Sequence, residues 1–128
     1  MHKCTICIGS NYNRKENLLF ARQKLAELFP TIRFASEQET QPLFFRSGAL
    51  FSNQMALFFS EAEEGMIRQE LKAIEQSAGR HPEDKKEEKI CLDIDLLTFD
   101  DRVLKPEDMK REYVMKGMEE LKDVEELK

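Results

Sequence analysis

The chain has no apolar run long enough to cross a bilayer, and no signal-peptide pattern opens it. Positive charge is also in short supply, since 20 basic side chains face 25 acidic ones and the net charge is −5. Non-specific binding to nucleic acid depends on neutralising phosphates with basic side chains, so this charge balance argues against it. We therefore expect a cytoplasmic globular protein with neither a membrane nor a nucleic-acid partner.

Cysteine is scarce, with three residues in the whole chain. Cys4 and Cys7 have the CxxC spacing of metal and redox sites, but the run 3–8 around them is typical of a strand. Side chains three residues apart on a strand point to opposite faces, so these two thiols cannot easily share a metal ion. Cys91 also lies in an apolar run. We expect three reduced, packed cysteines and no redox site.

What is present indicates one domain over residues 1–128, because a chain of this length can form a single core without cross-links. The stretch 37–48 lacks any sustained period and is expected as a loop, while the highly charged stretch 80–89 is expected as a surface loop without packed structure. Four segments are expected as strands, at 3–8, 31–36, 49–59 and 90–98.

Two helices lie between these strands, and a short helical stretch and a C-terminal helix follow the last strand. Asn13 opens the first with a capping-box pattern, and Pro30 stops its apolar repeat. Ser60 opens the second with the same pattern, and Gly79 ends it. Pro106 then begins a short helical stretch. The apolar positions of a C-terminal helix are Met118, Leu121, Val124 and Leu127.

This succession of strand, helix, strand, strand, helix, strand and helical tail is typical of the α+β split βαβ, or ferredoxin-like, fold. We expect a mixed sheet of four or more strands, with the helices packed mainly on one face and a C-terminal helix added. The other face and its loops would then be available for ligands. The fold hosts many functions, so it does not by itself fix one.

The most informative feature is a pair of carboxylates, Asp93 and Asp95, inside an otherwise apolar strand. Positions two apart on a strand share a face, and about two residues of rise, roughly 7 Å, separate them. Two carboxylates so placed could flank hard cations such as Mg²⁺. The alternative is an ordinary strand with a solvated face, although Asp is depleted in strands.

Five short motifs follow one another along the chain: Ile8-Gly9-Ser10-Asn11, Glu39-Thr40-Gln41-Pro42-Leu43, Phe51-Ser52-Asn53, Ile74-Glu75 followed by Gly79-Arg80, and Leu92-Asp93-Ile94-Asp95. Their order and spacing resemble the 6-hydroxymethyl-7,8-dihydropterin pyrophosphokinase family of folate biosynthesis. The resemblance implies transfer of a diphosphate from ATP to the pterin, giving the pterin diphosphate and AMP. It also implies small-molecule partners, and we expect a monomer.

The resemblance implies that Asp93 and Asp95 hold two Mg²⁺ ions between the ATP phosphates and the pterin hydroxyl, with Arg80 also among the catalytic residues. Such an arrangement is chemically reasonable, because diphosphoryl transfer depends chiefly on positioning and on neutralising charge. ATP is the co-substrate in this interpretation.

A flat, polar pterin needs aromatic faces and polar groups along its edge. By resemblance, Phe51 and Tyr113 supply the faces and Asn53 the edge, although periodicity by itself favours a core position for Phe51. The rest of the expected pocket consists of Asn11, Thr40, Pro42 and Leu43.

Nucleotide contacts are implied for Glu75 and Arg80, at the end of the second helix, and for Arg111 and Lys85. Without the family, Glu75 and Arg80 would be an ordinary surface acid and a C-terminal Arg favoured by the helix dipole.

Two family elements are missing. The chain contains no Trp, so the usual R-W-G-P-R loop is replaced by Glu87-Glu88-Lys89-Ile90, and no P-H-Y element follows Val103. The motifs expected to bind the pterin and the metal ions are thus present, whereas those expected to bind the nucleotide are altered. Two alternatives follow: a catalytically impaired pterin-binding or regulatory module, and a structural ferredoxin-like protein unrelated to folate.

Overall fold

The computed structural model describes residues 1–41, 49–81, 83–84 and 88–126. A six-stranded sheet forms its centre, in the order β2-β4-β1-β5-β6, and β3 pairs with β4 as well. The strands are β1 (His2–Ser10), β2 (Arg33–Phe34), β3 (Gln38–Thr40), β4 (Phe51–Ser60), β5 (Asp93–Phe99) and β6 (Arg102–Val103). The helices are α1 (Arg14–Leu28), α2 (Glu64–Ser77), the short 3-10 helix η2 (Asp108–Lys110) and α3 (Glu112–Glu126).

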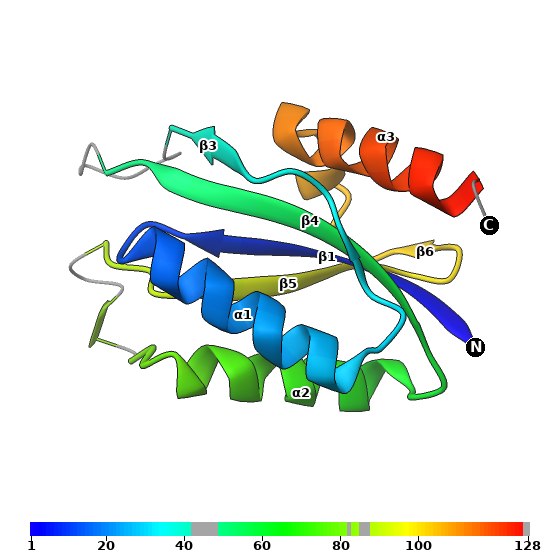
Figure 1. Cartoon of the computed structure of the whole chain (residues 1–128), viewed down its shortest axis with the longest axis horizontal. Coiled ribbons are helices and arrows are strands. Elements are labelled where there is room, and N and C mark those ends of the chain that lie inside the picture. The colour runs from blue at the N-terminus through cyan, green and yellow to red at the C-terminus, as the bar shows by residue number, and fades with distance from the viewer. Residues whose placement is uncertain (42–48, 82, 85–87, 127–128) are drawn as a thin grey trace.

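The expected α+β ferredoxin-like arrangement is confirmed, with one correction to the sheet. Every pairing between the described strands is antiparallel, where a mixed sheet was expected. The long central strand β1 pairs along its length with β4 and also with β5. As a result, residues from three distant parts of the chain lie side by side across β1 (Figure 1).

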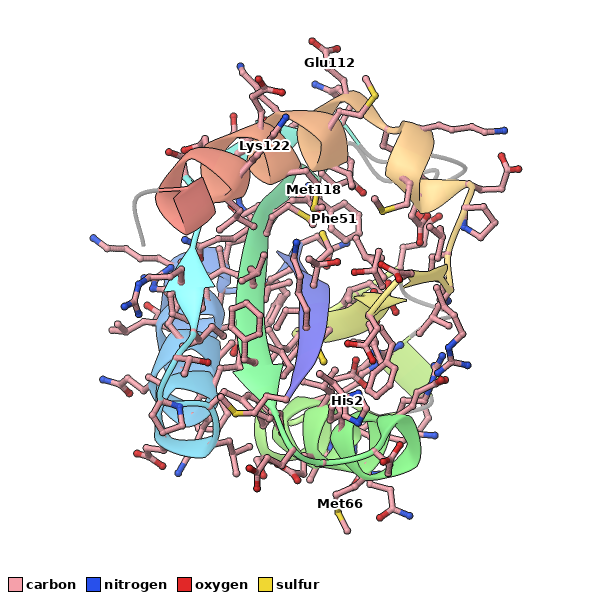
Figure 2. The ribbon with its side chains drawn as sticks, turned by 90° about the vertical axis from the view of Figure 1, so that its right-hand side faces the viewer. His2, Phe51, Met66, Glu112, Met118 and Lys122 are labelled. Carbon is pink, nitrogen blue, oxygen red and sulfur yellow. The ribbon has the colours of Figure 1, made fainter. Side chains whose placement is uncertain are left out.

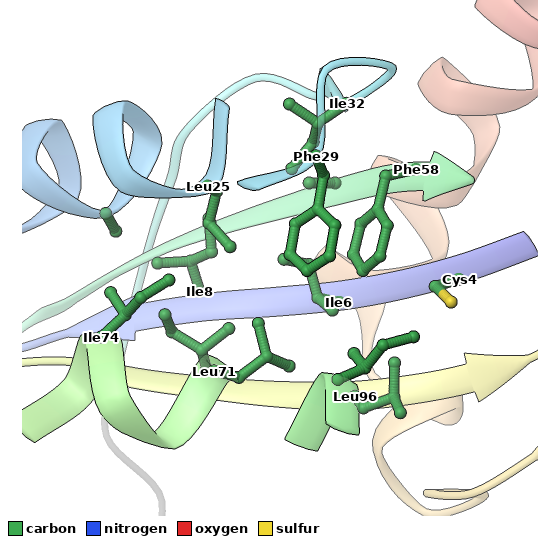
Figure 3. Close-up of a cluster of buried hydrophobic side chains, with 14 of the residues drawn as sticks. Cys4, Ile6, Ile8, Leu25, Phe29, Ile32, Phe58, Leu71, Ile74 and Leu96 are labelled. Carbon is green, nitrogen blue, oxygen red and sulfur yellow. The ribbon is translucent and has the colours of Figure 1, made fainter. Parts of the chain in front are cut away.

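The main core lies between the sheet and the helices α1 and α2. Alternate side chains of β1, including Ile6 and Ile8, are fully buried there against Leu25 of α1 and Leu71 of α2. The rings of Phe29 and Phe58 stack face to face (Figure 3). Their centroids are 3.9 Å apart. The period-2 pattern of the strands and the three-and-four spacing of the helices therefore meet in one core.

The C-terminal helix α3 covers the opposite face of the sheet, so the helices occupy both faces (Figure 1). Its residues Val114 and Leu121 are buried against Met55 and Leu57 of β4 and against Leu97 of β5. The face that was expected to be open for ligands is therefore partly covered by a helix. A cavity remains beneath the start of α3.

The helix ends differ from the expected caps. Asn13 occupies the N-cap of α1 in a left-handed conformation (φ 43°), but its side chain makes no capping hydrogen bond. The second helix begins at Glu64, with Glu63 as its N-cap, so Ser60 is not its cap; instead the Ser60 hydroxyl accepts a bond from the backbone of Ala62. Gly79 follows the end of α2 with φ 91°, as a helix-terminating glycine should.

Strand boundaries also differ. The segment expected at 31–36 contributes only the two residues of β2, and the supposed loop at 37–48 contains β3; its residues 42–48 lie outside the described part of the chain. β5 begins at Asp93 and not at residue 90. The backbone of Ile90 is hydrogen-bonded to the backbone and side chain of Asn11 instead of to a neighbouring strand.

The charged stretch 80–89 is more packed than expected in the part that is described. Asp84 is buried, its carboxylate accepts a bond from the backbone of His81, and its carbonyl accepts one from Lys89. The three cysteines are free, with Cys4 and Cys7 on opposite faces of β1. Among the described helices, none combines the length and apolarity that a membrane span requires.

Candidate functional site

A cavity of about 670 Å³ lies between the sheet and the start of α3. Its walls come from β3 on one side and from η2 and the first turns of α3 on the other. Figure 2 shows Phe51 beneath α3, on the sheet side of the helix. The floor is formed by side chains and backbone of the three central strands, namely Cys7, Gly9, Phe51, Asn53, Asp93 and Asp95.

The strand register explains how these residues meet. Gly9 of β1 lies opposite Asn53 of β4 on one side and opposite Asp93 of β5 on the other. One pleat along, Cys7 lies opposite Asp95. Because β5 alternates, Ile94 points into the main core while both aspartates point into the cavity. The predicted shared face of the two carboxylates is therefore present, and it opens on a cavity.

The two carboxyl groups interact with each other. Burial is the largest influence on Asp95 and raises its pKa to about 7, and the charge of Asp93 and a side-chain hydrogen bond with it act in the same direction. Lys105 opposes this pKa shift. Near neutral pH, the pair repels a second negative charge.

The donor set fits a hard divalent cation. Within the described residues no cluster of three or more Asp, Glu, His or Cys side chains could hold a metal ion by itself. Mg²⁺ rarely needs such a cage, since it is usually bound through one or two carboxylates together with waters and substrate phosphates. Burial and the charge of Asp93 raise the pKa of Asp95, and a cation between the two carboxylates would favour the ionised form of Asp95. The site suits Mg²⁺ that is bound jointly with a phosphate ligand.

Arg80 and Glu75 form a network beside the start of β5. The guanidinium of Arg80 donates to Oδ1 of Asp93 at 2.9 Å and lies 3.2 Å from Oε1 of Glu75. The other oxygen of Glu75 accepts the backbone N–H of Ile94 at 2.7 Å. Neither Glu75 nor Arg80 lines the cavity. As folded, both residues hold Asp93 and its strand in place.

Four of the residues expected around the pterin line the cavity, namely Thr40, Phe51, Asn53 and Tyr113. Phe51 from β4 and Tyr113 from α3 both line it, and burial raises the pKa of Tyr113 to about 12. Asn53 is 7% exposed, and its side-chain N–H donates to the hydroxyl of Thr40 at 2.6 Å. The side-chain amide of Gln38 donates a hydrogen bond of 2.9 Å to the backbone carbonyl of Tyr113, which connects the two walls.

The other expected residues are distributed differently. Arg111 lines the cavity, and its guanidinium pairs with Asp108 at 3.2 Å. Asn11 does not line it; its amide instead donates to the carbonyl of Glu88 and accepts from the N–H of Ile90, both at 2.6 Å. Outside the described residues lie Pro42, Leu43 and Lys85.

Sequence reasoning gave no role to several residues of the cavity, among them Gly9, Gln38 and Asp108. Gly9 belongs to the first motif, but its position between Asn53 and Asp93 can be recognised only when the strand order is known. Gln38 fell in an expected loop. Asp108 carried a weak signal, since it precedes Arg111 by three residues and such pairs face each other on a helical turn.

A comparison with curated proteins found no match. The model of the 7,8-dihydro-6-hydroxymethylpterin-pyrophosphokinase (HPPK) family matches residues 5–123, which includes every wall of the cavity. Membership implies pyrophosphokinase activity in folate biosynthesis. With the match extending over nearly the whole chain, the protein belongs to the 7,8-dihydro-6-hydroxymethylpterin-pyrophosphokinase family.

Proposed function

We propose that this chain transfers the diphosphate of ATP to the hydroxymethyl group of 6-hydroxymethyl-7,8-dihydropterin, with two Mg²⁺ ions held at Asp93 and Asp95. The supporting observation is that one cavity contains both the acidic pair and the group formed by Phe51, Asn53 and Tyr113. A flat heterocycle and a metal-bound phosphate could therefore meet there.

The residues of the chain bind and orient the reactants in this proposal. Phe51 and Tyr113 contact the ring, Asn53 bonds its polar edge, and Arg111 neutralises phosphate charge. The pterin oxygen forms a bond to the β-phosphorus, the bond from that phosphorus to the α-β bridging oxygen breaks, AMP leaves, and the hydroxyl proton passes to solvent. Bound Mg²⁺ supplies charge neutralisation. Arg80 and Glu75 keep Asp93 positioned for it.

An AMP-release assay with the pterin as acceptor tests the proposal. Asp95→Asn should lower kcat by about 10²–10³-fold, the usual effect of losing one charge-stabilising group in an active site. The matched control is Asp101→Asn, which removes an exposed acid from the turn before β6. Turnover should be unchanged in the control. An Asp95→Asn enzyme with wild-type turnover would contradict the proposed mechanism.

A second candidate is a pterin-binding relative with impaired catalysis. One observation favours it: of the expected nucleotide contacts in the described part of the chain, Glu75 and Arg80 face Asp93 and only Arg111 lines the cavity. Calorimetry with the pterin and with a non-hydrolysable ATP analogue separates the two functions. Binding of both in the presence of Mg²⁺ supports the enzyme, whereas pterin binding without nucleotide affinity supports the module.

A further inference from the structure

Gly9 occupies the middle of the cavity floor. It lies on the central strand β1, with Asn53 opposite it on β4 and Asp93 opposite it on β5. The proposed function places the polar edge of the ring at Asn53 and the metal ions at Asp93. A ligand that reaches from one to the other must therefore pass over Gly9.

The space above Gly9 is limited on one side only. A Cβ at this position would lie 3.2 Å from Oδ1 of Asn53 and 4.0 Å from the carbonyl oxygen of Ser52, and no other atom would be within 4 Å. In particular, no atom of Asp93 would be that close. A methyl group at Gly9 would therefore press on the side-chain amide of Asn53 and would not contact the acidic pair Asp93 and Asp95.

Asn53 has little freedom to move aside. Its side-chain nitrogen is bonded to the hydroxyl of Thr40 at 2.6 Å, and only 7% of the residue is exposed. A Cβ–oxygen separation of 3.2 Å is tighter than ordinary van der Waals contact, so the amide would have to shift by a few tenths of an ångström. That shift would break or bend its bond to Thr40 or turn its side-chain oxygen away from the cavity.

Glycine also has a cost at this place. In the interior of a strand it contributes no side-chain packing and loses more conformational entropy than other residues, and it commonly marks a site where a ligand or another backbone approaches closely. The neighbours of Gly9 on the same face of β1, Cys7 and Thr5, both carry side chains. The missing side chain thus coincides with the point where the two halves of the cavity meet.

We propose that Gly9 is a specificity-determining residue: its bare backbone leaves the amide of Asn53 open to the ring edge and the floor clear between that edge and Asp93. This inference rests on the proposed function, because it assigns the ring edge to Asn53. It concerns recognition of the pterin and not of the nucleotide.

Gly9→Ala tests the inference by calorimetry, with the pterin and with a non-hydrolysable ATP analogue plus Mg²⁺ titrated separately. Pterin affinity should fall about tenfold, comparable to the loss of one hydrogen bond. Affinity for the nucleotide analogue should stay within about twofold of wild type, because the added methyl group does not reach Asp93. The matched control is Gly65→Ala, where a Cβ would meet no atom within 4 Å; it should change neither affinity.

A double-mutant cycle separates direct contact from general destabilisation. Asn53→Ser shortens the side chain that the new methyl group would press on. In that background, Gly9→Ala should cause no further loss of pterin affinity and no further fall in melting temperature. This comparison also holds if Gly9→Ala alone folds poorly, because Asn53→Ser removes the close contact in the double mutant.

Equal pterin affinity in wild type and Gly9→Ala would overturn the inference while leaving the proposed function intact. An equal loss of pterin and nucleotide affinity would overturn it too, since the effect would not be confined to the Asn53 side. A wild-type chain that binds no pterin would overturn the proposed function and this inference together.

Discussion

Gly117 of helix α3 lies directly over Met55 of the sheet. A Cβ at Gly117 would be 2.6 Å from Cβ of Met55, far inside van der Waals contact. Met55 is 1% exposed, so its side chain has no open space to enter. Tyr113 lies one turn earlier on the same helix. The contact at Gly117 therefore sets how far Tyr113 lies from the floor of the cavity.

Gly117→Ala should therefore destabilise the protein. Alanine has a helix propensity about 1 kcal/mol better than glycine, but inserting a methyl group into a packed contact typically costs about 1–3 kcal/mol. We expect a net loss in the free energy of unfolding, measured by urea denaturation. Pterin affinity should fall as well, because α3 must move outward with Tyr113.

The control for this substitution is Gly65→Ala in α2, where a Cβ meets nothing within 4 Å and the residue is exposed. It should be neutral or stabilising by up to about 1 kcal/mol. If both glycine variants gained stability to the same degree, close packing of α3 on β4 would be the wrong explanation for Gly117.

Asp95 should make the stability of the metal-free protein depend on pH. Its pKa is raised from 3.8 to about 7 in the fold, chiefly by burial, so the folded state holds this proton more tightly than the unfolded state. The stabilisation is fully present below pH about 3.8 and is lost as the pH rises through about 7. Asp95→Asn should remove this dependence. Scanning calorimetry should then show a difference in melting temperature between wild type and variant that changes between pH 4 and pH 8.

Adding MgCl₂ to the wild type should offset the loss above pH 7, because a bound cation favours the ionised carboxylate. The same salt should have little effect on Asp95→Asn. Melting curves of wild type and variant that stay parallel across the pH range would contradict the assignment of Asp95 as a buried, titrating group.

His2 and Asp100 provide a second pH-dependent contact, at the far end of β1. Nδ1 of His2 lies 2.6 Å from Oδ2 of Asp100, and this hydrogen bond is the largest cause raising the pKa of His2 above its ordinary 6.5. The stabilisation is fully present below pH about 6.5 and disappears as the pH rises through the raised pKa of His2. An NMR titration should find the elevated value in wild type.

Asp100→Asn should return the pKa of His2 towards 6.5, whereas Asp101→Asn, one residue along the same turn, should leave it raised. An unchanged titration of His2 in Asp100→Asn would mean that Glu63, 3.4 Å away, provides the dominant interaction.

Asn11 should be a structural support of the segment before β5. Its side chain makes two hydrogen bonds of 2.6 Å to the backbone of Glu88 and Ile90. Asn11→Ala should lower the free energy of unfolding by about 2 kcal/mol, the sum of two typical bonds. Hydrogen exchange of the Ile90 amide, which donates to Oδ1 of Asn11, should speed up most.

Asn17→Ala gives the comparison for that measurement, since it removes a single side-chain bond, to the carbonyl of Tyr12, on an exposed part of α1. It should cost less stability and leave exchange at Ile90 unchanged. Unchanged hydrogen exchange at the Ile90 amide in Asn11→Ala would contradict this role. The bond from the backbone N–H of Asn11 to the carbonyl of Ile90 would then hold the segment by itself.

Local patterns predicted some elements well and others poorly. Asp93 and Asp95 were placed on one strand face from alternation, and the structure puts both in the cavity. The three-residue strand β3 was missed because Gln38–Thr40 is too short to show a period, and it exists only by pairing with β4. Ser60 matched a helix cap in sequence, but its hydroxyl bonds to Ala62 in the turn before the helix.

The site itself shows the same division. Asn11 and Glu75 were predicted as binding residues from motif position, and the fold uses their side chains to bond the backbone of Ile90 and Ile94. A motif identifies a residue and its neighbours in sequence. It does not reveal which backbone groups across the fold lack a partner, and those groups decide where a side-chain amide or carboxylate bonds.

The amino-acid order determined which side chains could share a face, because the pleat of a strand and the turn of a helix are local properties of the backbone. It therefore determined that Asp93 accompanies Asp95 and that Ile94 opposes them. Only the tertiary structure decided that β1 runs between β4 and β5, and hence that Gly9 separates Asn53 from Asp93. Strand neighbours are selected by burying α1 and α2 on one face and α3 on the other, which depends on contacts between residues far apart in the chain.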